Sequence, residues 1–273
     1  MTSRALRQAQ YNTSVTNWSL SEVEMTLYIP RKYKTLLESF CKLSFFKISF
    51  MQFNKSSLQY LKDLQKNNNR DWFAETKPTF LEAQNNAKEL YAAIRENLEK
   101  HDEIEKFKLF RIYRDVRFSK DKTPYKAHFA GSYARLGKQL RGGYYLRIRP
   151  GESFLAGGFW EPNKDDLLRI RKEIEVDATE IRDILKDKNY IKYFGGKFEG
   201  EELKTAPRGF DKEHPDVDLL RKKGFIAVRN FTDEEVLSDN FINEVNASYK
   251  ALRPFFNLFS DILTTNLNGE SLI

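Results

Sequence analysis

A change in the hydrophobic period along the chain constrains its fold more than any other sequence feature. Between residues 107 and 160, apolar and polar side chains alternate with a period of two, in short runs rich in Tyr, Phe and Ile. This alternation predicts strands over 107–113, 127–134, 143–149 and 153–159, and a later run predicts one over 225–231. Strands joined by such short connections are expected to pair antiparallel.

Helical spacing occurs on both sides of this region. Apolar residues recur three or four apart over 58–64 and 80–98, over 163–185, and in a long final helix from about 239 that Pro254 is expected to kink. Strands in the middle and helices from both ends of the chain predict an α+β fold, with helices packed on one face of a mainly antiparallel central sheet. Since no internal repeat or linker interrupts the pattern, we expect a single domain.

The first fifty residues lack a sustained period of either kind, whereas Met51 opens a segment that is patterned at once. We interpret residues 1–50 as a disordered leader or upstream extension and 51–273 as one α+β domain. Arg4 and Arg7 precede the first acidic residue, Glu22, as in organelle leaders, so a targeting peptide is an alternative for this segment.

Composition excludes several classes of protein. Cys41 is the only cysteine, which rules out an intrachain disulfide, rules out thiol catalysis after residue 51, and favours a cytoplasmic location. No run approaches the roughly 18 apolar residues of a membrane span, so membrane insertion is not expected. His101, His128 and His214 are too widely spaced for a zinc motif, and no phosphate-loop spacing is present; we expect neither a metal nor a cofactor.

The charge is unevenly distributed along the chain. The formal net charge of +7 conceals a segment, residues 111–149, in which eleven Lys and Arg face only Asp115 and Asp121, a local net charge of +9. Such polarity predicts an electropositive surface on an otherwise acidic body. The expected partner is therefore an anionic small molecule or a nucleic acid.

The densest group of candidate binding residues lies within this segment. If the chain stays extended, alternation places Arg111, Tyr113, Asp115 and Arg117 on one face, opposite Ile112, Val116 and Phe118. Guanidinium groups bind phosphate or carboxylate in pairs of hydrogen bonds, lysines add mobile charge, and tyrosines can stack on a base. The candidate ligand-binding residues here are Arg111, Tyr113, Arg114, Arg117, Lys120, Lys122, Tyr125 and Lys126.

Three alternatives to anion binding remain open for this segment. Asp115 and Asp121 could pair with the surrounding cations in a plain solvated ion-pair network. The protein could instead be an enzyme, with Asp115 or Asp121 as general base, His128 as acid or base, and the arginines stabilising negative charge. It could also be an interaction module whose sheet face docks a partner protein.

A second candidate group lies at residues 207–215. A glycine turn followed by a helix starting at Pro215 would present free backbone N–H groups to an anion, with Arg208 assisting. The alternative is that His214 merely caps this helix. Further upstream, the pair Gly157-Gly158 predicts a β-bulge.

Three stretches of the sequence resemble a known family. They read RIYRDVRFSKDKTPYK, GGYYLRIRPGESFLAGGFW and APRGFDKEHPD, and they are similar to domain-of-unknown-function family 2461, conserved hypothetical proteins of bacteria and fungi. The likeness runs from about Met51 to near the C-terminus. It implies one domain starting at Met51, and it implies no activity, because the family has none assigned.

Overall fold

A five-stranded antiparallel sheet forms the centre of the protein. The computed structural model describes residues 52–273, which fall within one compact unit, Lys47–Ile273. The strands follow chain order across the sheet, β1-β2-β3-β4-β5, and every neighbouring pair is antiparallel. They are β1 (Ile104–Leu109), β2 (Phe129–Arg135), β3 (Gly143–Ile148), β4 (Ser153–Phe159) and β5 (Phe225–Phe231). The predicted α+β class is confirmed, whereas the leader expected at residues 1–50 lies outside the described residues.

The predicted strands match the observed ones unevenly. Strands β4 and β5 have the predicted bounds, and β3 ends one residue early. Strand β1 begins three residues and ends four residues earlier than predicted, because alternation continues past Phe110 although the chain leaves the sheet there. The backbone N–H of Phe110 makes the last contact with β2, donating to Ala130 O at 2.8 Å.

Three helices precede the sheet: α3 (Lys55–Lys66), α4 (Arg70–Glu75) and α5 (Lys77–Leu98). Helix α5 has Pro78 in its first turn, where the missing N–H costs nothing. Its predicted apolar stripe is buried, comprising Phe80, Ala83, Ala87, Leu90, Tyr91, Ile94 and Leu98. The period of the sequence therefore identified this helix and its buried face correctly.

The remaining helices follow β4. They are α6 (Lys164–Val176), α7 (Thr179–Lys186), α8 (Lys188–Phe194), α9 (Val217–Leu220), α10 (Asp233–Val236), α11 (Phe241–Ala251) and α12 (Arg253–Thr264). The single final helix expected from residue 239 is two helices that meet at Leu252. Pro254 is the reason, since it cannot donate within a continuous helix but fits the first turn of α12.

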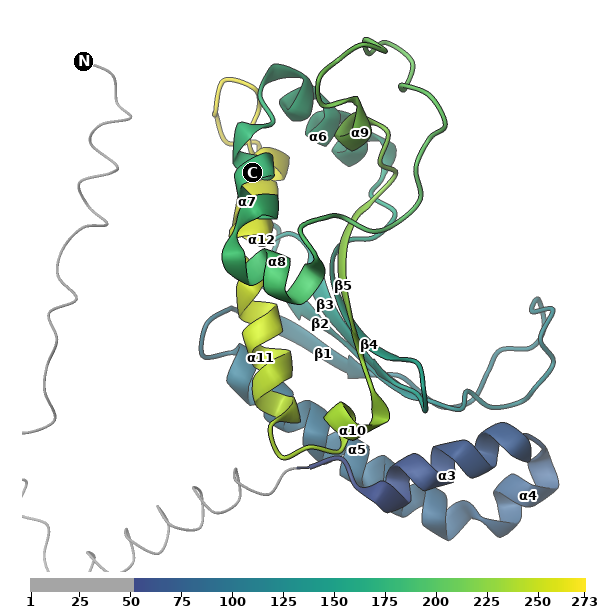
Figure 1. The fold of residues 1–273 in the computed structure, drawn as a ribbon. Helices are drawn as coiled ribbons and strands as arrows, with labels where there is room; N and C mark the ends of the chain where they lie inside the picture. Colours follow the sequence, from purple (N-terminus) through teal and green to yellow (C-terminus); the bar gives the residue numbers. More distant parts are fainter. Residues whose placement is uncertain (1–51) are drawn as a thin grey trace, which may run out of the picture. The chain divides into compact units, whose positions relative to one another are not determined.

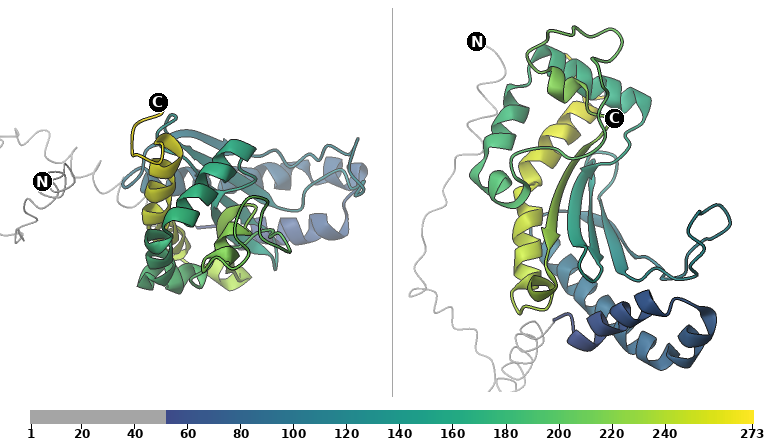
Figure 2. Two further views of the ribbon diagram at one scale, coloured as in Figure 1. Left: turned by 90° about the horizontal axis from the view of Figure 1, so that it is seen from above. Right: turned by 45° about the vertical axis from the view of Figure 1, so that its right-hand side comes forward.

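Helices α5, α11 and α12 lie on one side of the sheet, as Figures 1 and 2 show. Strand β3 illustrates the consequence, because Tyr144, Leu146 and Ile148 are buried while Tyr145 and Arg147 are only half-buried. We call the second side, which no described helix covers, the open face. Register places on it Lys106, Lys108, Ala130, Ser132, Tyr145, Arg147, Phe154 and Ala156.

The bulge expected at Gly157-Gly158 is absent, because both residues pair in unbroken register with β3 and β5. A Cβ at Gly157 would lie 2.3 Å from Leu252 Cδ1, and one at Gly158 would lie 2.2 Å from Phe225 O. Gly158 also has a φ of +143°. The two glycines are thus needed for close approach of neighbouring atoms rather than for a bulge.

Candidate functional site

The connection between β1 and β2 carries most of the predicted site residues. Residues 110–128 leave the sheet as a paired excursion, with a β-bridge between Tyr113 and Tyr125. Arg114 N donates to Pro124 O at 2.9 Å, and Lys126 N donates to Ile112 O at 2.7 Å. Figure 1 shows this connection projecting beyond the sheet on the side away from α11 and α12. We call it the β1–β2 arm.

The base of the β1–β2 arm is fixed to the helix pair α3–α4. The Asn68 side chain donates to Tyr125 O at 2.9 Å and accepts from Tyr125 N at 3.1 Å. The Tyr125 ring is 6% exposed and stacks on Phe73, with ring centroids 3.9 Å apart. Tyr113 contacts the same Phe73 edge-on and is 48% exposed. Of the two predicted tyrosines, Tyr113 therefore remains accessible, while Tyr125 serves as an anchor.

The two acidic residues of the β1–β2 arm are engaged by neighbours within it. Arg117 binds Asp115 through two nitrogens, at 3.0 and 2.7 Å, and Arg114 pairs with Asp121 at 2.9 Å. The hydrogen bonds from Arg117 lower the pKa of Asp115, and those from the Thr123 backbone and hydroxyl lower the pKa of Asp121. Both carboxylates are thus held ionised, which makes them poor proton acceptors.

Several cations near the β1–β2 arm lack such partners. Within residues 52–273, no ion pair or side-chain hydrogen bond involves Arg111, Lys120 or Lys126. Lys122 Nζ donates only to Val116 O, at 3.0 Å. Asp115 and Asp121 therefore neutralise two of the predicted cations of the arm, and its other predicted cations have no carboxylate partner among the described residues.

Three of the predicted residues meet at a pocket where the β1–β2 arm joins the open face. The pocket has a volume of about 250 Å³ and is lined by Phe110, Arg111, Lys126, His128, Ala130 and Tyr145. No carboxylate belongs to this lining. Burial lowers the pKa of His128 to about 4, helped by the nearby positive charges of Arg147, Lys126, Arg149 and Arg114. Around neutral pH the imidazole is therefore neutral and can both donate and accept hydrogen bonds.

Two arginines beside this pocket were missed as site residues. Arg147 and Arg149 share one carboxylate, that of Glu152, at 3.5 and 3.1 Å, and their Nε atoms are enclosed without a hydrogen-bond partner. The alternation of the run Tyr145 to Arg149 would have identified them, because it places Tyr145, Arg147 and Arg149 on one face.

His128 and the two acids do not form a proton-transfer unit in the described structure. No hydrogen bond joins His128 to Asp115 or Asp121 within the described residues, and cations, not these acids, are the charged groups that shift its pKa. The geometry expected of a general acid and base is thus missing here.

The second predicted group is elsewhere. Arg208 is exposed on the segment between α8 and α9, at the opposite end of the molecule from the β1–β2 arm (Figure 1). Helix α9 begins at Val217 rather than Pro215 and has only 4 residues. His214 Nδ1 accepts from Asp216 N at 3.1 Å just before this helix, but Asp216 is the N-cap residue and no side-chain hydrogen bond caps α9, so His214 is not the cap that the alternative expected.

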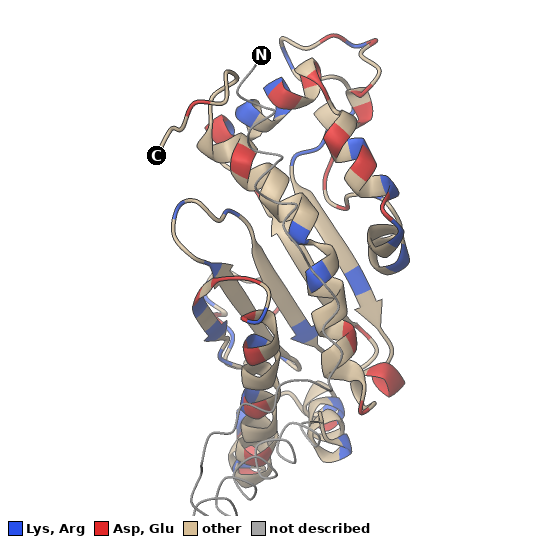
Figure 3. Ribbon diagram, turned by 90° about the vertical axis from the view of Figure 1, so that its left-hand side faces the viewer, with Lys and Arg blue, Asp and Glu red and all other residues tan. Residues whose placement is uncertain are grey.

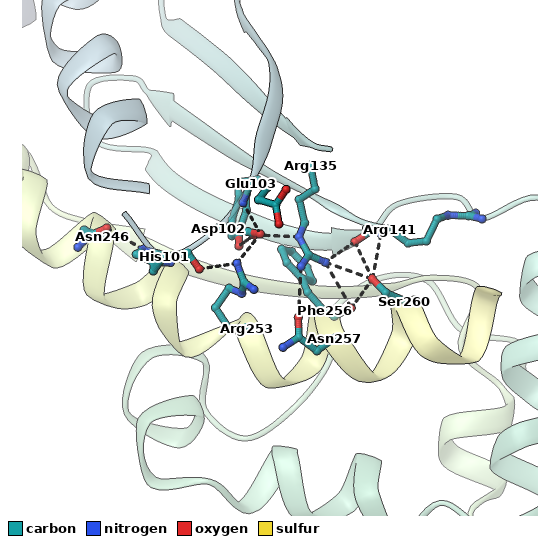
Figure 4. Close-up of polar contacts among 11 residues, drawn as sticks. His101, Asp102, Glu103, Arg135, Arg141, Asn246, Arg253, Phe256, Asn257 and Ser260 are labelled. Atoms are coloured by element: carbon teal, nitrogen blue, oxygen red, sulfur yellow. Dashed lines mark hydrogen bonds and ion pairs between the residues drawn. The ribbon is translucent and has the colours of Figure 1, made fainter. Parts of the chain in front are cut away.

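A buried ion pair on the helix-bearing side also escaped prediction. The side chains of Asp102 and Arg135 are both 0% exposed, with Arg135 Nε 2.8 Å from Asp102 Oδ2 (Figure 4). The same carboxylate accepts from Tyr144 and pairs with Arg253, while Arg135 also donates to Arg141 O at 2.9 Å. Burial, followed by the nearby Asp102 charge, raises the pKa of Tyr144. Because no solvent reaches this pair, we assign it a structural role.

Charge is distributed differently on the helix-bearing side than on the β1–β2 arm. There, basic and acidic residues are both present on the helices (Figure 3). Many of them pair locally, as Arg169 does with Glu173 at 2.7 Å and Arg182 with Asp216 at 2.8 Å. The helices also carry lysines without an ion pair among the described residues, such as Lys88, Lys164 and Lys188, so what distinguishes the β1–β2 arm is its local excess of basic over acidic residues.

Comparison with known proteins gave one match. No curated protein and no solved structure matches the chain, and no helix among the described residues is long and apolar enough to cross a membrane. The model of the family described as conserved hypothetical protein (DUF2461) matches residues 56–258, which include the sheet, the β1–β2 arm and the first half of α12. The chain therefore belongs to the DUF2461 family of conserved hypothetical proteins.

Proposed function

We propose that the protein binds an anionic ligand, carrying phosphate or carboxylate groups, on the open face beside the β1–β2 arm. The observation that supports this most is the pocket of about 250 Å³ with Arg111, Lys126 and His128 in its lining and no carboxylate among them. Like charges brought together without compensation repel each other, and a bound anion relieves that repulsion.

The neighbouring arginines strengthen the proposal. Arg147 and Arg149 share a single carboxylate, Glu152, whose side chain is 55% exposed. An exposed carboxylate can exchange its ion pairs for others at small cost, since such pairs contribute at most about 1 kcal/mol. Both guanidinium groups are therefore available to a ligand at the pocket.

His128 adds a polar group to the pocket lining without adding a positive charge. Its pKa of about 4 keeps the ring neutral in this cationic setting. A neutral imidazole offers one N–H donor and one acceptor, which suits a partly protonated phosphate or a sugar hydroxyl. The enzyme alternative has less support, because Asp115 and Asp121 are held by Arg117 and Arg114.

Isothermal titration of the full chain with inorganic tripolyphosphate at low salt tests this proposal. Arg111→Ala and Lys126→Ala remove cations that have no ion pair among the described residues, so folding should be unaffected. Each charge-assisted hydrogen bond lost is expected to weaken binding about tenfold.

Lys188→Ala is the matched control, because Lys188 is an exposed lysine on α8, on the helix-bearing side. It should bind tripolyphosphate like the parent. The proposal is wrong if the parent does not bind, or if Arg111→Ala and Lys126→Ala weaken binding no more than Lys188→Ala does.

A further inference from the structure

Three aromatic rings form a row across the open face. Phe110 follows β1, Tyr145 belongs to β3 and Phe154 to β4. The Phe110 and Tyr145 centroids are 6.4 Å apart with an interplanar angle of 41°, and those of Tyr145 and Phe154 are 5.5 Å apart at 35°. All three are half-buried, so the row is part of the accessible surface.

Small residues lie beside two of these rings, Phe110 and Tyr145, whereas Phe154 pairs directly with Arg147. Tyr145 pairs with Ser132 on one side and Ala156 on the other, while Ala130 lies beside Arg147 in the next row of the sheet. Ala130 also lines the pocket together with Phe110 and Tyr145. Short side chains beside large rings leave room for a planar group against the ring faces.

Cations lie over the two outer rings of the row. Lys108 Nζ lies 5.5 Å from the Phe110 centroid, and the Arg147 guanidinium lies 4.4 Å from that of Phe154. Lys106, next but one along β1, is exposed and has no ion pair among the described residues. Rings for bases, with positive charge alongside for phosphates, are the combination by which proteins bind single-stranded nucleic acids.

The extent of the surface favours a polymer over a small molecule. The pocket volume of about 250 Å³ is small for a small-molecule site, where about 300–1,000 Å³ is usual. The cations also extend beyond it, from Lys106 and Lys108 on β1 to Arg149 after β3. A flexible polymer with one negative charge per nucleotide can contact cations distributed over an area larger than the pocket.

We infer that the open face binds single-stranded nucleic acid, with bases stacked on the row Phe110, Tyr145 and Phe154 and phosphates on the flanking lysines and arginines. This inference rests on the proposed anion binding and adds to it a requirement for bases. The two can be separated by a ligand that keeps its phosphates and lacks its bases.

Fluorescence anisotropy on the full chain provides the test, with a mixed-sequence single-stranded DNA dodecamer and an abasic strand of equal length. Loss of stacking should weaken binding of the abasic strand about tenfold or more. Tyr145→Leu should weaken binding of the dodecamer about tenfold and leave that of the abasic strand unchanged. Tyr145→Phe keeps the ring and should bind the dodecamer like the parent.

Trp160→Leu is the aromatic control, because Trp160 is 72% exposed and follows the end of β4 remote from Phe154. Its dodecamer affinity should equal the parent's. Equal affinity for the dodecamer and the abasic strand, or tighter binding of a duplex of the same sequence, would overturn the inference and leave anion binding intact. Failure to bind the dodecamer would also overturn it, and only a parallel failure with tripolyphosphate would remove anion binding as well.

Discussion

Replacing Asp102 with Ala should destabilise the protein more than most single substitutions. Asp102 is the carboxylate of a wholly buried pair, and its removal leaves the Arg135 guanidinium, 0% exposed, without a countercharge. The Tyr144 hydroxyl loses its acceptor at the same time. Breaking a buried pair by removing one partner costs about 3–5 kcal/mol, because the remaining charge stays desolvated.

The hydrogen bonds that Arg135 keeps after the substitution determine how much unfolding free energy is lost within that range. Arg135 keeps Arg141 O at 2.9 Å, and Ser260 Oγ and Asn257 Oδ1, each at 3.2 Å. These neutral acceptors partly solvate the charge, so we expect a loss of about 3 kcal/mol of unfolding free energy. For a domain of this size that corresponds to a fall of roughly 6–12 °C in Tm.

Urea denaturation followed by far-ultraviolet circular dichroism measures the loss. The double variant Asp102→Asn with Arg135→Met serves as the comparison, since it removes both charges and keeps an acceptor for Tyr144. It should lie within about 1–2 kcal/mol of the parent, because neutral replacement of a buried pair costs little. A loss below about 1 kcal/mol for Asp102→Ala, or a double variant less stable than that single variant, would refute the reasoning.

Three further predictions follow from local geometry. Nuclear magnetic resonance should give His128 a pKa near 4. Because this pKa lies below the 6.5 of an unfolded chain, His128 contributes stability above pH 6.5 that is lost as pH falls towards 4. In the His128→Gln variant, the unfolding free energy should therefore decrease less between pH 6.5 and pH 4. A measured His128 pKa of 6.5 or higher would contradict the buried and positively charged surroundings described for this side chain. Asn68→Ala removes both hydrogen bonds to the Tyr125 backbone and should speed proteolysis within residues 111–124, whereas unchanged cleavage would show that Phe73 stacking suffices. Gly158→Ala should lower Tm by several degrees, because its Cβ would meet Phe225 O at 2.2 Å, and an unchanged Tm would show that β5 can shift.

The sequence predicted the sheet and the α5 helix well because their signals are local. Alternation in β4 reflects one buried and one open face, and a three-or-four spacing in α5 reflects one buried stripe. The end of β1 was wrong for the opposite reason. The chain turns out of the sheet where Tyr125 packs on Phe73 and binds Asn68, which is 57 residues away in sequence.

The candidate site was predicted only in part. Arg111, Lys126 and His128 do line one pocket, whereas the positions of Arg117 and Tyr125 depend on partners that spacing does not reveal. Phe118, expected on an apolar face, is 93% exposed because residues 110–128 do not continue as a strand. Asp102 and Arg135 are 33 residues apart and meet through the register of β1 and β2, so neither residue carries a local signal.

The proposal that an anion binds at Arg147 and Arg149 can be tested directly by nuclear magnetic resonance. The Nε–H signals of the arginine side chains would be followed in the full chain during titration with inorganic tripolyphosphate. The signals of Arg147 and Arg149 should shift together with those of the His128 ring, while that of Arg182, bound to Asp216 at 2.8 Å on the helix-bearing side, should stay in place. Unchanged Arg147 and Arg149 signals, or an equal shift of Arg182, would contradict it.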